Sequence, residues 1–93
     1  MIRPTLNINI NGSDAFDLID PRRTAMDHLM DAIEALKRAT PNGRDYPGEY
    51  DRCTADRATH FDRLAALHTL REELLDEALH IQQQEKKREL IEN

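Results

Sequence analysis

The sequence has no tryptophan, a single cysteine and no long apolar run. The lone Cys53 excludes an internal disulfide, so a reducing cytoplasm is the expected setting. The longest apolar runs have two or three residues, which predicts neither a transmembrane span nor a signal peptide. Phe and Tyr contribute only two residues each, so aliphatic side chains and Met must build the core.

An excess of basic residues is also missing. The chain has 13 Lys and Arg against 18 Asp and Glu, a formal net charge of −5, so nucleic acid is not an expected partner. An acidic surface can meet a basic patch on a protein, although it usually serves only solubility. The 93 residues predict one small domain, 1–93, and such domains often gain stability by oligomerising.

A very long amphipathic helix is predicted over 49–89. Between Tyr50 and Leu90 there is neither Pro nor Gly, and strong helix formers dominate. Apolar residues at helical spacing cover roughly 200° of its surface, about twice what one partner needs. This helix must therefore be covered from more than one side. These apolar residues are Phe61, Leu64, Leu67, Leu70, Leu74, Leu75, Ala78, Leu79 and Ile81.

Residues 5–18 are predicted to form a β-hairpin. Polar and apolar residues alternate in its first half, and the Asn-Gly pair at 11–12 signals a tight turn. A three-residue loop, 11–13, is preferred to a two-residue loop because it pairs Ile8 with Phe16 and places the large apolar side chains on one face. Two strands alone are marginally stable, so the hairpin must lie on the helices or join a partner's strand.

A first helix is predicted over 20–39, with Asp20 as its N-cap and Pro21 at its first position. A loop with two Pro and two Gly follows at 40–48. The predicted fold class is therefore α+β, mostly α: a β-hairpin followed by an antiparallel helical hairpin. The apolar face of the first helix consists of Met26, Leu29, Met30, Ile33 and Leu36.

The unequal lengths of the two helices predict self-association. A first helix of roughly 30 Å covers a second of roughly 60 Å only as far as about Leu70. The β-hairpin and another subunit are both expected to cover the rest, giving a dimer or higher homo-oligomer, and the tail at 90–93 is expected to fray. The predicted interface consists of Leu70, Leu74, Leu75, Ala78, Leu79 and Ile81.

Residues 41–46 read Pro-Asn-Gly-Arg-Asp-Tyr. This segment resembles the Asn-Gly-Arg-Asp-Tyr loop between two helices in small, uncharacterised proteins of phages, prophages and other proteobacterial mobile elements. The likeness extends to the Ile-Asp-Pro helix start at 19–21 and to the Leu-rich second helix. The resemblance implies a genetic setting and no chemistry. Small phage proteins of this kind are often accessory factors that bind and disarm a host component.

The same loop is a candidate ligand site. Asn42 and Gly43 favour a tight turn whose backbone N–H groups can hold an anion. Arg44 offers a fork of donors, and Tyr46 can stack on a base or fill an interface. In the alternative interpretation, Arg44 pairs locally with Asp45 while Tyr46 caps the core.

Three polar residues, His60, His68 and Arg71, fall inside the apolar stripe of the second helix. A guanidinium there must be paired or must line a wet pocket. Arg71 therefore either pairs with a carboxylate of the first helix or of another subunit, or forms an anion site at a subunit interface with one of the histidines beside it.

Catalytic and metal chemistry are not expected. The Glu77–His80 spacing occurs in di-iron bundles, and the acidic run at 72–76 loosely resembles a magnesium motif of nucleotide hydrolases, but a solvated charged face explains both. Cys53 and His60 lie about 10 Å apart along the helix, too far for a nucleophile and its base.

Three functions are therefore considered. The leading hypothesis is a small non-enzymatic cytoplasmic binding protein, phage-derived, that binds and inhibits a host protein. The first alternative is an oligomeric sponge for a small anionic ligand such as a signalling nucleotide, held by Arg44, Tyr46 and Arg71 at subunit boundaries. The second is a magnesium-dependent all-α nucleotide hydrolase. The leading hypothesis requires no cofactor and no membrane.

Overall fold

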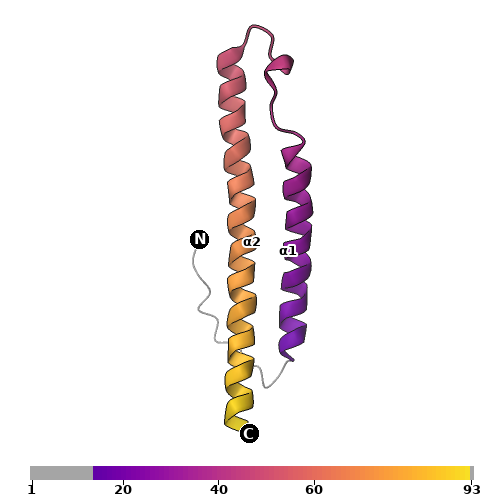
Figure 1. The fold of residues 1–93 in the computed structure, drawn as a ribbon, viewed down its shortest axis with the longest axis vertical. Coiled ribbons are helices and arrows are strands. Elements are labelled where there is room, and N and C mark those ends of the chain that lie inside the picture. Colours follow the sequence, from indigo (N-terminus) through magenta and orange to yellow (C-terminus); the bar gives the residue numbers. More distant parts are fainter. Residues whose placement is uncertain (1–13, 93) are drawn as a thin grey trace.

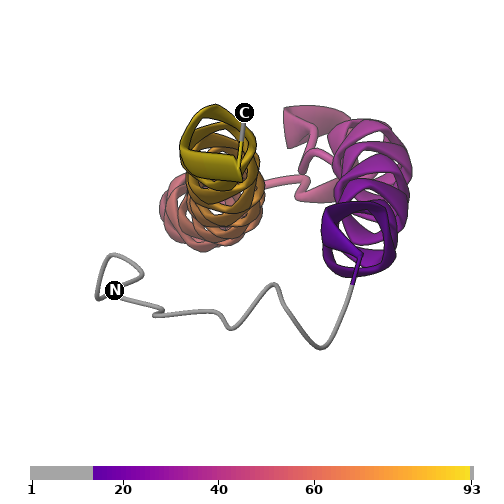
Figure 2. The ribbon, with the colours of Figure 1, turned by 90° about the horizontal axis from the view of Figure 1, so that it is seen from below.

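A computed structural model describes residues 14–92 as two long antiparallel helices joined by a loop (Figure 1). Helix α1 spans Ala15–Lys37, the short 3-10 helix η1 spans Gly43–Asp45, and helix α2 spans Tyr50–Glu92. The molecule measures 69 × 21 × 17 Å. Viewed along its length, the two helices lie side by side in one layer (Figure 2). The predicted antiparallel helical hairpin is thus confirmed.

The predicted β-hairpin is wrong, and with it the α+β class, because the described part of the chain is all helical. Residues 15–18, expected in the second strand, form the first turn of α1, while 5–13 lie outside the described residues. Asp14 caps this turn by accepting a hydrogen bond from the Phe16 N–H at 3.2 Å. Phe16 is 62% exposed, so it does not fill a core as the strand pairing required.

Burial explains why the chain turns helical so early. Ala15 packs against Ile81, which is completely buried, and Leu18 and Ile19 pack against the same pair. In a helix these residues lie at spacings of three and four, so all of them can face α2. Because burial of these residues requires helical spacing, α1 begins at Ala15 rather than after Asp20.

Pro21 consequently lies inside α1 rather than at its first position. It has no N–H to donate to the carbonyl one turn earlier, which weakens the helix at this point. Two side chains that follow Pro21 donate to backbone carbonyls that precede it. Arg22 Nη1 donates to the Leu18 carbonyl at 2.7 Å, and Thr24 Oγ1 donates to the Asp20 carbonyl at 3.1 Å.

The two helices meet along one continuous seam. On both, the seam positions follow alternating steps of four and three residues, the 3.5-residue period of helices that pack as a left-handed pair. Ile33 and Ile81 are fully buried in it. The seam of α1 consists of Ala15, Ile19, Arg22, Met26, Leu29, Ile33 and Leu36, followed by Thr40 just after the helix. That of α2 contains His60, Leu64, Leu67, Arg71, Leu74, Ala78 and Ile81.

The expected lack of cover beyond Leu70 does not arise. Because α1 begins at Ala15, it reaches Ile81, and Ala78 and Ile81 are buried within the chain itself. Beyond the end of α1, the connector runs alongside the first part of α2 before crossing to it (Figure 1). Among the described residues, no helix is long and apolar enough to cross a membrane.

Candidate functional site

The loop residues that the sequence singled out do not form one site. Asn42, Arg44 and Asp45 are exposed on the η1 turn. The Asn42 side chain accepts the Arg44 N–H at 3.1 Å, so that group is not free to hold an anion. Within the described residues no ion pair joins Arg44 to Asp45. Only Tyr46 turns back towards α2.

Tyr46 lines a hollow of about 380 Å³, which we call the loop-end pocket. It lies where the end of α1 and the loop meet α2. Its lining combines an apolar wall from α1 and the loop with polar side chains from α2. The lining residues are Leu36, Ala39, Pro41, Tyr46, Asp56, Thr59, His60 and Arg63.

A hydrogen bond across this pocket joins Tyr46 of the loop to α2. The Tyr46 hydroxyl donates to the Asp56 carboxylate at 2.8 Å. The bond raises the pKa of the Tyr46 phenol, because it favours the protonated form and the nearby negative charge opposes ionisation. Tyr46 therefore acts as a donor that positions one oxygen of Asp56.

His60 is the pocket's buried polar group, with 6% of its surface exposed. Its Nε2 lies 3.1 Å from Thr40 Oγ1, and that hydroxyl already donates its only proton to the Lys37 carbonyl at 2.7 Å. Thr40 must therefore accept from His60, which places the imidazole proton on Nε2. In the neutral ring, Nδ1 is then left as an acceptor.

The pocket carries one full charge of each sign. Asp56 supplies a carboxylate and Arg63 supplies a guanidinium, and both residues are exposed at its edge. Arg63 makes no ion pair with any other described residue. The pocket can thus offer acceptors and donors to the same small molecule while Leu36, Ala39 and Pro41 cover its apolar part.

The predicted trio of His60, His68 and Arg71 is not brought together. His60 lines the loop-end pocket, His68 is exposed, and Arg71 lies in the seam. The Arg71 Nε is buried and has no hydrogen-bond partner among the described residues. Within residues 14–92 the helices are joined by an ion pair from Arg22 Nε to Glu77 Oε2, at 3.1 Å and about three-quarters buried.

Metal-binding geometry is not found in residues 14–92, where no three His, Cys, Asp or Glu side chains gather around a common point. Glu77, one residue of the i, i+3 spacing considered above as a metal motif, pairs with Arg22. Cys53 is a buried free thiol.

A second hollow, the side groove, lies at the other end of the hairpin along one flank of the seam. It has a volume of about 270 Å³. Leu75 and Leu79 remain 41% and 45% exposed beside it. Its lining residues are Ile19, Arg23, Met26, Leu75, Ala78, Leu79 and Gln82.

The side groove divides the predicted interface residues. Leu75 and Leu79 line it and are exposed, whereas Ile81 is buried in the seam and Leu74 is half-buried there. Leu70 is 38% exposed but does not line the groove. At 100° per residue, Leu70 and Leu75 point about 140° apart around α2.

Protein-family models, curated proteins and solved structures give no match to this chain. The chemistry of the two hollows therefore rests on their own residues. Sequence patterns indicated Tyr46 and His60 but missed Asp56 and Arg63. Those two are ordinary exposed charges of a charged helix, and only the path of the loop turns them into pocket residues.

Proposed function

We propose that this protein acts by non-covalent binding, as a helical hairpin that pairs with a second copy of itself and in that form binds a host protein. The observation that carries the pairing is the side groove, where Leu75 and Leu79 are exposed beside Ile19 and Met26. Apolar side chains gathered on one flank of a helical pair commonly mark a binding surface.

The shape of the molecule supports a second copy as the occupant. Its radius of gyration is 19.5 Å, against about 12 Å for a compact domain of this length. It exposes 7200 Å², against roughly 5,500 Å² for a compact monomer of this mass. The excess is larger than the roughly 800 Å² that each partner buries in a standard interface.

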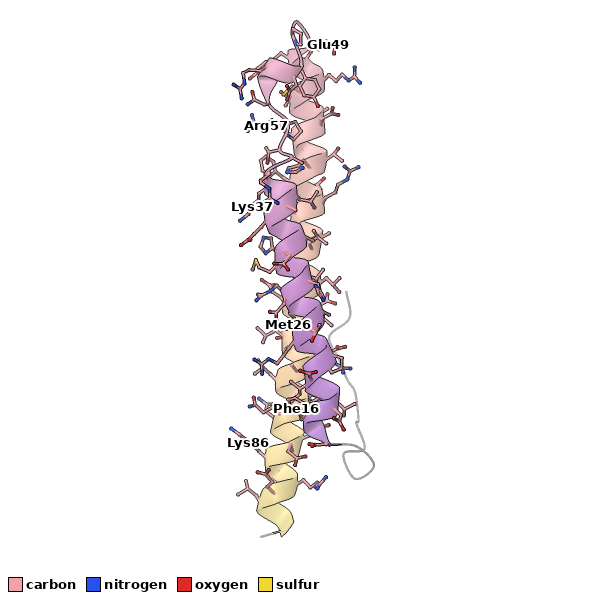
Figure 3. The ribbon with its side chains drawn as sticks, turned by 90° about the vertical axis from the view of Figure 1, so that its right-hand side faces the viewer. Phe16, Met26, Lys37, Glu49, Arg57 and Lys86 are labelled. Carbon is pink, nitrogen blue, oxygen red and sulfur yellow. The ribbon has the colours of Figure 1, made fainter. Side chains whose placement is uncertain are left out.

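Pairing through the side groove would convert one layer of helices into two. In a two-fold symmetric dimer the same surface of each copy forms the contact, so the two side grooves would face each other. Leu75 and Leu79 of each copy would then enter the other's groove. Phe16 lies on the same helix as Met26 (Figure 3) and three residues before Ile19, so it would lie at the margin of the contact. The product is a four-helix bundle, an arrangement that buries helical faces on both sides of a shared core.

Sedimentation velocity at micromolar concentration tests this pairing. We expect the wild type to sediment as a dimer and Leu75→Glu to sediment as a monomer, because the substitution places a carboxylate without a partner in an apolar contact. Two matched controls replace exposed leucines of α2 outside the groove. Leu70→Glu and Leu90→Glu should both leave the dimer intact.

A monomeric wild type at all concentrations tested would contradict the pairing. Dissociation by Leu70→Glu but not by Leu75→Glu would place the contact on the opposite flank. Circular dichroism of every variant must show unchanged helical content, so that loss of pairing is not confused with unfolding.

The host-protein part of the proposal is supported by the likeness of the 41–46 loop to loops of small phage and prophage proteins. The exposed η1 turn presents Arg44 for such a contact. We expect Arg44→Ala to leave the melting temperature unchanged. If a host protein is captured with the wild type and then purified, the variant should bind that purified protein with lower affinity. Unchanged binding would remove the loop from the contact.

A further inference from the structure

The loop-end pocket lies at the opposite end of the hairpin from the side groove and has no part in the proposed pairing. We propose that the loop-end pocket binds a small zwitterion, an α-amino acid with an apolar side chain. The ammonium group would lie at Asp56, the carboxylate at Arg63, and the side chain against the wall formed by Leu36, Ala39 and Pro41.

The spacing of the two charges fits such a ligand. Asp56 and Arg63 are seven residues apart on α2, so they share a face and are separated by about 10 Å along the axis. An amino acid bonded at both ends fills that span, with charge-assisted bonds of about 2.8 Å at each end. Among the described residues neither side chain is in an ion pair, so both charges remain available.

His60 adds a second acceptor for the ammonium group. Its Nε2–H is used by Thr40 at 3.1 Å, so the neutral ring retains Nδ1 as an acceptor on a residue that lines the pocket. The Tyr46 hydroxyl occupies only one carboxylate oxygen of Asp56, at 2.8 Å. An ammonium group has three donors and can use both remaining acceptors.

The charge balance argues for a zwitterion rather than a simple anion or cation. An anion drawn to Arg63 would meet the Asp56 carboxylate, and a cation drawn to Asp56 would meet the Arg63 guanidinium. The surrounding segment 37–63 carries six Lys and Arg against five Asp and Glu, so it favours neither sign. Only a ligand with both charges satisfies both side chains.

The size of the pocket agrees with this class of ligand. Its volume of about 380 Å³ lies near the lower end of the roughly 300–1,000 Å³ range of small-molecule sites. That space accommodates an amino acid with a branched aliphatic side chain, and the Tyr46 ring and Leu36 can cover that side chain.

An NMR titration of the full-length protein with leucine tests the proposal. We expect leucine to shift the backbone amide signals of residues 56–63 and to saturate in the millimolar range. Leucinamide lacks the carboxylate and N-acetylleucine lacks the ammonium group, so each should bind at least tenfold more weakly. Equal affinity for all three would show a non-specific apolar hollow and would overturn the proposal, as would no shift with leucine.

Substitutions in the pocket give the second test. Asp56→Asn and Arg63→Gln should each weaken leucine binding on the order of tenfold, because each removes a charge-assisted bond. Asp62→Asn and Arg57→Gln change nearby exposed charges of α2 outside the lining and should leave binding unchanged. An equal effect of these controls would contradict the assigned contacts. Arg63 is exposed and makes no described ion pair, so its variant should remain folded.

Discussion

Tyr46 and Asp56 show how one exposed hydrogen bond can make stability depend on alkaline pH. Their bond raises the pKa of the Tyr46 phenol above its value of about 10 in an unfolded chain. The folded state therefore holds this proton more tightly. The stability that the bond contributes is fully present below about pH 10 and is lost as the pH rises through the folded-state pKa.

Tyr46→Phe should remove this pH dependence. We expect the difference in free energy of unfolding between wild type and variant to shrink above about pH 10, as measured by urea denaturation at a series of pH values. A direct readout is also available, since Tyr50→Phe leaves Tyr46 as the only tyrosine. In that background Asp56→Asn should lower the phenol pKa measured by ultraviolet absorbance, and an unchanged pKa would contradict the assigned cause.

Ile33 should contribute more to stability than any exposed leucine. It is fully buried in the middle of the seam. Ile33→Ala should lower the free energy of unfolding by about 3 kcal/mol or more, through lost burial and the cavity that remains. Leu90→Ala, at a residue 78% exposed, is the matched control and should change it by less than about 0.5 kcal/mol. Urea denaturation measures both, and similar costs would contradict the seam as described.

The start of α1 yields a prediction at the level of the element. If α1 begins at Ala15, Pro21 interrupts a formed helix, and Pro21→Ala should raise the free energy of unfolding by at least about 1 kcal/mol. Asp14→Ala should lower it by about 1 kcal/mol through loss of the N-cap. A helix beginning after Asp20 would give the opposite pattern, with no effect at position 14 and no gain at Pro21.

This start is also where sequence reasoning failed most clearly. Asp20-Pro21 has the residue types of a helix start. The free energy of such a local cap is small compared with the burial of Ala15, Leu18 and Ile19 against Ile81. The alternation before residue 15 has the two-residue period of a strand, and this is why it suggested a β-hairpin. A local pattern of this kind carries no information about the contact with Ile81, which lies far along the chain. Propensity and the absence of Pro and Gly did predict a long second helix, and α2 spans Tyr50–Glu92 against the predicted 49–89.

The seam itself was obscured by the residues beside it. Exposed Phe61 and Leu79 widened the apparent apolar stripe of α2, while the polar residues His60 and Arg71 occupy true seam positions. A hydrophobic count therefore gave a broad face, whereas the buried positions follow alternating steps of four and three. The loop-end pocket was only half visible because Asp56 and Arg63 acquire their role from the loop that passes over them.

The whole molecule distinguishes two neighbouring leucines. Leu74 is half-buried in the seam of one chain, whereas Leu75 lies on the side groove. Leu74→Glu should lower the melting temperature at every protein concentration, because it disrupts the hairpin itself and not only an assembly. Leu75→Glu should lower it only at concentrations where the wild type is paired. Thermal melts over a hundredfold concentration range measure both effects, and the same concentration dependence for both variants would contradict this division.

The loop between α1 and α2 also sets the order in which the seam can close. Thr40 and His60 are separated by 20 residues, whereas Arg22 and Glu77 are separated by 55, so the entropy lost on closing each contact grows with distance from the loop. Folding should therefore proceed from the loop towards Ala15, in the manner of a zipper. During synthesis the first turn of α1 cannot pack against α2 until Ile81 has left the ribosome. Until then Ala15, Leu18 and Ile19 remain exposed to solvent and to contacts with other molecules.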